Sequence, residues 1–214
     1  MSANDRALVV YESMFGNTER IAEAVAEGLR SGLAAEVVRA DRAPLRLPEV
    51  GLVVVGGPTH AFGMSRANTR VIASVQGPTV MPVETGIRDW LEQLPYQAGA
   101  PMGATFDTRA SKGRRLPGSA ARSAAKVLHK RGFKTPTEPV SFFVIDTVGP
   151  LAGGELVRAR NWGEKLANVW SGRPERSPSR VWIAARVTKL HGGGPLVDRP
   201  HYGGSRRSAG TAHG

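Results

Sequence analysis

The sequence predicts an α/β open sandwich, in which helices cover both faces of a parallel β-sheet. Short and almost wholly apolar runs alternate with amphipathic segments between residues 7 and 170. Runs of this kind are typical of strands that are buried on both faces, and their alternation with helices favours a parallel sheet. Polar segments with glycine follow three of the runs, as loops do at the carboxyl edge of such a sheet.

Five apolar runs account for the strands. They cover residues 7–11, 35–38, 52–55, 100–106 and 140–145. The third run leads into Gly56-Gly57-Pro58, where we expect the strand to end in a glycine turn. The fourth run is the weakest by propensity, because Pro101 and Gly103 are poor strand formers.

Four segments with apolar residues three and four positions apart predict the helices. They cover residues 19–29, 85–94, 119–131 and 154–170. Thr85 and Ser119 stand at the starts of the second and third segments and are typical N-cap residues. Gly32 and Gly132 follow the first and third segments, where a helix C-cap is expected.

Composition indicates one globular domain followed by a basic tail. The chain of 214 residues is 41% hydrophobic and 22% charged, and its formal net charge is +11. Residues 171–214 hold eight Lys and Arg but only two acidic residues, so they contribute +6 of this charge. Because this segment is rich in proline and glycine and offers little apolar surface, we expect a domain over residues 1–170 and a disordered tail over 171–214.

Several classes of protein are excluded or disfavoured by what the sequence lacks. The chain has no cysteine, which excludes disulfides, thiolate metal sites and cysteine nucleophiles. Its five histidines show no metal-ligand spacing, and no residue pattern indicates a catalytic nucleophile. No apolar run approaches the roughly 18–20 residues of a membrane span, and no signal peptide is expected. We therefore expect a cytoplasmic monomer without a membrane partner.

The sharpest motif lies between the first strand and the first helix. Tyr11-Glu12-Ser13-Met14-Phe15-Gly16-Asn17-Thr18 combines side-chain donors with a glycine that permits a tight turn. A helix N-terminus presents unpaired N–H groups, so such a loop suits a phosphate group that is held by neutral donors alone. The same residue types also cap ordinary helices. The lysine of nucleotide-triphosphate loops and the G-x-G-x-x-G pattern of dinucleotide folds are both absent.

Two further segments follow the third and fourth strands. Pro58-Thr59-His60-Ala61-Phe62-Gly63 offers flat side chains for a planar ligand. Phe106-Asp107-Thr108-Arg109 offers hydrogen-bonding groups for the edge of a heterocycle. Each segment is also compatible with an ordinary turn. Because the carboxyl ends of parallel strands share one edge, we expect all three polar segments to open on the same side of the sheet.

A run of positive charge begins at the end of the fourth strand. Nine cations lie between residues 109 and 134 without any acidic residue among them: Arg109, Lys112, Arg114, Arg115, Arg122, Lys126, Lys130, Arg131 and Lys134. A solvated helix face and a basic loop explain the run without any partner. In functional terms, the run suits an acidic partner protein or a phosphorylated cosubstrate such as NADPH. Nucleic acid is disfavoured, because no aromatic residues alternate with the cations.

Over roughly residues 6–170 the sequence resembles the flavodoxin family. Ser13-Met14-Phe15-Gly16-Asn17-Thr18 is similar to the family's phosphate loop, T/S-x-T/S-G-N-T. Gly57-Pro58-Thr59-His60 and Thr105-Phe106-Asp107-Thr108-Arg109 look like its two ring-binding loops. The resemblance implies a flavodoxin-like sheet of five parallel strands in the order 2-1-3-4-5, with FMN at the edge between the first and third strands.

The resemblance also assigns roles to the three segments. Residues 13–18 are expected to hold the ribityl phosphate, and residues 58–63 and 105–109 the isoalloxazine. The ring-flanking Trp and Tyr of typical flavodoxins are not evident, so we expect the ring to be less shielded. The glycine whose peptide turns toward the flavin falls at Ala61 or Gly63, and a positive φ at Ala61 would cost about 1–2 kcal/mol.

The function that the resemblance implies is electron transfer by a bound FMN. Typical flavodoxins are acidic, so the basic chain predicts a redox partner protein that is itself acidic. A small FMN-dependent oxidoreductase that uses NAD(P)H is the enzymatic version of this hypothesis, although no residues indicate a substrate pocket over the ring. The alternative from another class is a binding or regulatory module that has kept the fold and lost FMN.

Overall fold

The computed structural model describes residues 5–47, 49–61, 63–82, 84–97, 99–113 and 117–172. The chain divides into two units, Met1–Glu175 and Arg176–Gly214, and all described residues belong to the first. The tail that we predicted over residues 171–214 lies outside the described residues from position 173 onward.

Five parallel strands form the sheet, in the order β2-β1-β3-β5-β6. The strands are β1 (Arg6–Tyr11), β2 (Ala34–Arg39), β3 (Leu52–His60), β5 (Met102–Ala110) and β6 (Val140–Val144). A short sixth strand, β4 (Gly63–Met64), pairs antiparallel with the end of β3 and lies off this path. When β4 is left out of the count, the predicted order 2-1-3-4-5 is confirmed.

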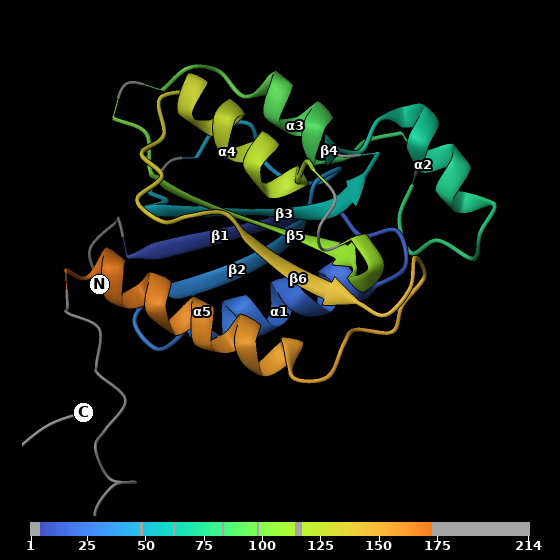
Figure 1. Ribbon diagram of the computed structural model, residues 1–214. Helices are drawn as coiled ribbons and strands as arrows, with labels where there is room; N and C mark the ends of the chain where they lie inside the picture. The colour runs from blue at the N-terminus through green and yellow to red at the C-terminus, as the bar shows by residue number, and fades with distance from the viewer. Residues whose placement is uncertain are drawn as a thin grey trace, which may run out of the picture. The chain divides into compact units, whose positions relative to one another are not determined.

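Helices cover both faces of this sheet (Figure 1). The helices α1 (Asn17–Leu29) and α5 (Glu155–Trp170) pack together on one face, and α3 (Ile87–Gln93) and α4 (Ala120–Lys130) lie on the other. The helix α2 (Ala67–Ser74) stands near the carboxyl ends of the strands, at the right of the view. No helix among the described residues is long and apolar enough to cross a membrane.

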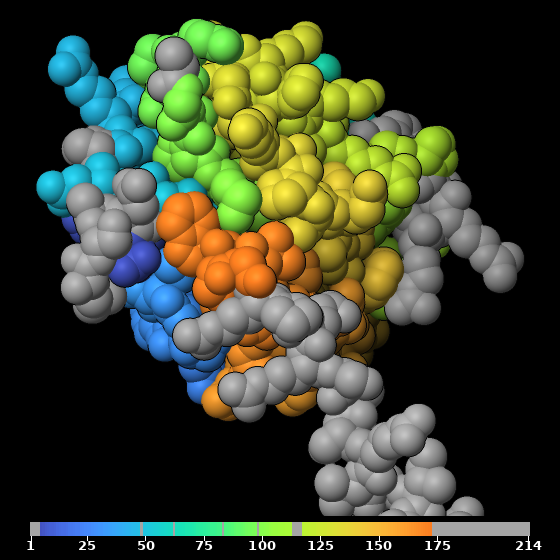
Figure 2. All heavy atoms as spheres, turned by 90° about the vertical axis from the view of Figure 1, so that its left-hand side faces the viewer, coloured from blue at the N-terminus to red at the C-terminus, as the bar shows by residue number. Residues whose placement is uncertain are grey.

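The core consists of two layers, one on each side of the sheet. Val9 and Val54 belong to the layer under α1 and α5, whereas the neighbouring strand residues point into the layer under α3 and α4. In the first layer Phe106, Phe142 and Trp162 pack edge to face, with ring centroids 5.8 to 6.1 Å apart. The apolar runs are thus buried from both sides, as expected of central parallel strands. Figure 2 shows the end of the domain where α5, in orange, lies against the blue N-terminal part of the chain.

Two strands extend beyond their predicted ends. The strand β3 continues through Gly56 and Gly57 to His60, so the expected glycine turn does not form. Gly56 instead provides space, because a β-carbon there would lie 2.0 Å from the Phe106 ring. The strand β5 runs on to Ala110, because residues 106–110 pair with β6. The segment predicted as a loop after the fourth strand is therefore part of that strand.

The helix ends are partly as predicted. Ser119 caps α4, since its hydroxyl accepts a hydrogen bond from the Arg122 N–H, and Gly132 adopts a left-handed φ of 94° after that helix. Thr85 is not a cap, because α3 begins after Gly86. Gly32 is not a C-cap either, because α1 ends at Leu29 with a right-handed Arg30.

Candidate functional site

A cavity of about 350 Å³ opens at the carboxyl ends of β1, β3 and β5. Its volume is within the range of sites that bind small molecules. Its walls come from four parts of the chain: Ser13, Met14, Phe15, Asn17 and Thr18 after β1; Pro58, Thr59, His60 and Ala61 at the end of β3; Thr69, Ile72, Ala73 and Gln76 on and after α2; and Thr108, Arg109, Ala110, Val144 and Thr147 from β5, β6 and the segment after β6.

The cavity is lined mainly by neutral groups. Arg109 is the single formally charged residue among the described lining residues, and its Nη1 donates to the Gly118 carbonyl at 3.2 Å. Burial lowers the pKa of His60, so this side chain is neutral at pH 7. A site of this kind suits a ligand that is held by hydrogen bonds and flat contacts rather than by ion pairs.

The segment of residues 13–18, which we call the phosphate loop, borders this cavity and carries unused hydrogen-bond donors. Gly16 adopts a left-handed conformation with φ of 81° and forms the N-cap of α1. The backbone N–H groups of residues 14–18 find no acceptor among the described residues. The hydroxyl of Ser13, a residue only 1% exposed, also has no hydrogen-bond partner there. Because a buried, unpaired hydroxyl costs about 1–3 kcal/mol, these donors fit an anionic acceptor such as a phosphate group.

The phosphate loop is held in place from several sides. The Thr18 and Thr108 hydroxyls are 2.7 Å apart, which joins the first turn of α1 to β5. The Asn17 amide donates to the Val148 carbonyl at 2.8 Å, which joins the loop to the segment after β6. The Ser13 N–H donates to the Met81 sulfur at 3.1 Å. The donors are therefore fixed before any ligand binds, which lowers the entropic cost of binding.

The end of β3 forms the neighbouring wall. His60 pairs with Gly63 in the β3–β4 hairpin, and Ala61 lies in the turn between them. The positive φ that we expected at position 61 or 63 occurs at Ala61, where φ is 40°. Phe62, which we predicted as a ring contact, lies outside the described residues.

Several predicted site residues do not line the cavity, among them Gly16, Gly63, Phe106 and Asp107. Side chains alternate along β5, so Phe106 points into the aromatic core under α1 and α5. Asp107 points to the other face, where its Oδ2 accepts from the Thr59 hydroxyl at 3.0 Å and from the Ala121 N–H at 3.1 Å. The structure thus places Asp107 as an anchor for the start of α4. Gly63 belongs to β4 and does not line the cavity.

Sequence reasoning missed the wall that α2 provides. Thr69, Ile72, Ala73 and Gln76 line the cavity, yet no helix was predicted over residues 67–74. The pattern that predicts an amphipathic helix, with apolar residues on the buried face, is absent here. The outward side chains of this helix are aliphatic, and its fully buried side chain is Arg70. A buried arginine cannot be recognised from an apolar pattern.

Comparison with known proteins finds a family model that matches part of the chain. The flavodoxin family model matches residues 9–85, a range that contains the phosphate loop and the end of β3. No curated protein matches the sequence.

Solved structures of flavodoxins share the fold of the described domain. A flavodoxin from the domain Archaea is 20% identical, with a TM-score of 0.54, and the match covers 78% of this chain and 99% of that one. Flavodoxin 2 from Bacillus cereus is 17% identical, with a TM-score of 0.52 and coverage of 78% and 98%. A short-chain flavodoxin associated with a bacterial microcompartment is 14% identical, with a TM-score of 0.54 and coverage of 77% and 98%. The family model thus matches the first part of the domain, and the solved structures show that the domain has the flavodoxin fold.

Proposed function

We propose that the domain binds FMN non-covalently and carries electrons between partner proteins. The observation that carries this proposal is the set of unused donors in the phosphate loop: the buried Ser13 hydroxyl and the N–H groups of residues 14–18. The loop that carries these donors lines a cavity of suitable size, and none of the described lining residues is acidic. A phosphate held there also gains from the N-terminal end of the α1 dipole.

The remaining walls suit the other parts of FMN. We expect the lining residues at the end of β3 and in β5, among them His60 and Thr108, to contact the isoalloxazine. When bound, FMN supplies one-electron and two-electron transfer, chemistry that the side chains of this chain do not offer. The chain itself binds the cofactor and excludes water from one side of it.

The surface charge favours an acidic redox partner. Arg122, Lys126 and Lys130 are exposed at successive i, i+4 positions along α4. None of the ion pairs of the described residues involves these three cations. The helix begins at the carboxyl edge of the sheet, where the cavity opens. A stripe of free cations in this place would steer an acidic protein toward the cofactor.

The decisive experiment is a visible spectrum of the purified protein followed by titration of the apoprotein with FMN and with riboflavin, which lacks the phosphate. We expect a yellow protein that binds about one FMN per chain. Ser13→Ala is expected to lower the affinity for FMN about tenfold or more, the worth of one hydrogen bond to a charged group, and to leave riboflavin binding unchanged. Ser123→Ala is the matched control, because that hydroxyl bonds to the Ser119 carbonyl within α4, away from the cavity.

Two results would contradict the proposal in different ways. A colourless protein that ignores FMN at high micromolar concentration would leave a binding module on the flavodoxin fold. Rapid oxidation of NADH or NADPH by the FMN-loaded protein alone would show an oxidoreductase rather than a carrier.

A further inference from the structure

The helix α2 contributes much to the cavity but is poorly anchored by apolar contacts. Val71, Ile72 and Val75, on or just after this helix, are 51%, 59% and 82% exposed. Only Arg70 and Ala73 are buried among its eight residues. An alanine offers little apolar surface, so something other than the hydrophobic effect must hold the helix against the domain.

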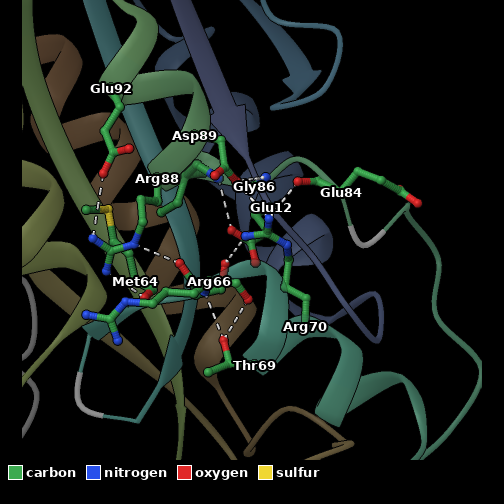
Figure 3. Close-up of polar contacts among 12 residues, drawn as sticks. Glu12, Met64, Arg66, Thr69, Arg70, Glu84, Gly86, Arg88, Asp89 and Glu92 are labelled. Carbon is green, nitrogen blue, oxygen red and sulfur yellow. Dashed lines mark hydrogen bonds and ion pairs between the residues drawn. The ribbon is translucent and has the colours of Figure 1, made fainter.

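A buried arginine provides this attachment (Figure 3). The Arg70 side chain is 0% exposed and makes hydrogen bonds to three different segments. Its Nη1 donates to the Ser65 hydroxyl, and its Nη2 donates to the Glu84 carbonyl and to Asp89 Oδ2, each at 2.8 Å. The guanidinium thus joins α2 to the start of α3 and to the segment that precedes it.

A buried carboxyl group connects this cluster with the phosphate loop. Glu12 directly precedes Ser13 and is fully buried, and its Oε2 accepts a hydrogen bond from the Ile87 N–H at 2.9 Å. Burial raises the pKa of Glu12, while hydrogen bonds from Ser65 and Ile87 and the charge of Arg70 oppose that rise. The packing is tight, since a β-carbon at Gly86 would lie 2.3 Å from Glu12 Oε2.

We propose that Glu12, Arg70 and Asp89 form a positioning cluster that holds the α2 wall at a fixed spacing from the phosphate loop. The cluster touches the base of the loop through Glu12 and the wall through Arg70, so it sets the width of the cavity between them. This inference rests on the proposed function only in naming FMN as the ligand. The positioning itself is a property of the protein without ligand.

A purely structural role for the cluster predicts something different. Breaking it would then lower the stability of the whole domain and leave the flavin affinity of the folded protein unchanged. A positioning role predicts a local effect, because α2 has few other contacts that would keep it in place.

The first test is hydrogen exchange in the full-length apoprotein, compared between the wild type, Arg70→Met and Arg131→Met. Arg131 is a partly buried arginine at the far end of α4 that donates to the Glu92 carbonyl, so it serves as the matched control. We expect the amides of residues 67–74 to exchange at least tenfold faster in Arg70→Met than in the wild type, with α1 and α5 unchanged. Uniform acceleration across the domain, or none at α2, would overturn the proposal.

The second test is titration of the same variants with FMN and riboflavin. Arg70→Met is expected to weaken the binding of both ligands about tenfold, because both would occupy the cavity whose width the cluster sets. Arg70→Lys retains the charge but not the planar fork, and should restore only part of the affinity. Equal affinity of Arg70→Met and the wild type for both ligands would overturn the positioning role and leave the FMN proposal standing.

A third variant guards against a failure to fold. Asp89→Asn keeps the shape of a side chain that is 34% exposed and removes one charge from the cluster, so it should give the same changes in smaller size. If the wild type binds no flavin, the proposed function fails, and the hydrogen-exchange comparison still decides whether the cluster positions α2.

Discussion

Ala61 adopts a backbone conformation that residues with a β-carbon rarely adopt. Its φ of 40° lies in the left-handed region, and the residue is exposed in the turn between β3 and β4. Glycine adopts this conformation without the steric cost of about 1–2 kcal/mol that other residues bear. We expect Ala61→Gly to raise the free energy of unfolding by about 1 kcal/mol, measured by urea denaturation.

The control for this prediction is the same substitution in a regular helix. Ala125→Gly lies within α4, and there glycine should lower the free energy of unfolding by about 1 kcal/mol. Destabilisation by both substitutions would show that Ala61 is not strained.

Glu12 makes the stability of the domain depend on pH. Burial raises the pKa of its carboxyl in the folded protein above the unfolded value of 4.5. Between these two pKa values the folded protein binds more protons than the unfolded chain, so this residue's contribution to the free energy of unfolding falls as pH rises through that window.

We expect Glu12→Gln to remove that contribution. The difference in unfolding free energy between the wild type and the variant should move against the wild type as pH rises above the unfolded pKa of 4.5. Urea denaturation at several pH values measures this difference, and a difference that is constant with pH would contradict the prediction.

At the scale of secondary-structure elements, α1 and α5 meet through two glycines. A β-carbon at Gly28 would lie 2.0 Å from the Arg160 carbonyl oxygen, and one at Gly163 would lie 2.2 Å from the Val25 carbonyl oxygen. Alanine is the better helix former by about 1 kcal/mol, but the two backbones would have to separate. We expect Gly28→Ala to destabilise the domain by about 1–3 kcal/mol in chemical denaturation.

Gly32→Ala provides the comparison. A β-carbon at Gly32 would meet the Ala167 β-carbon at 3.4 Å, close to ordinary van der Waals contact. This variant should therefore change the stability by less than Gly28→Ala, and equal losses would argue against a specific helix–helix contact.

The elements that sequence reasoning identified are those with a strong pattern. The apolar runs and amphipathic segments predicted five strands and four helices, and the polar segments beyond β1 and β3 led to the cavity. Phe106 and Asp107 were predicted as site residues, but they do not line the cavity. The directions of their side chains follow from the extension of β5, and this extension depends on pairing with β6. The helix α2 was missed because a buried ionic cluster replaces an apolar face, and such clusters form from residues distant in sequence.

At the scale of the whole molecule, charge is the property that should govern encounters with partners. The formal net charge is +11, and attraction between exposed charges is screened beyond about 10 Å at 0.1 M salt. We expect electron transfer with an acidic redox protein to slow about tenfold between about 0.05 M and 0.5 M salt, measured by stopped-flow absorbance.

The rate of this electron transfer should depend on where the positive charges lie as well as on the net charge. Lys126→Glu alters the stripe on α4, whereas Lys165→Glu makes the same change in net charge at an exposed position on α5. At low salt the first substitution should slow the reaction more than the second. Equal slowing would show that only the net charge acts.

The exposed aliphatic side chains on α2 have a consequence for the lifetime of a bound cofactor. Because the helix is held mainly by the hydrogen bonds of Arg70 and buries no large apolar side chain, we expect it to detach without uncovering the core. We then expect the residence time of a cofactor in the cavity to depend on how firmly α2 is attached through its ionic cluster. It should not depend on the global stability of the domain. Substitutions that strengthen the core would leave cofactor release as fast as before.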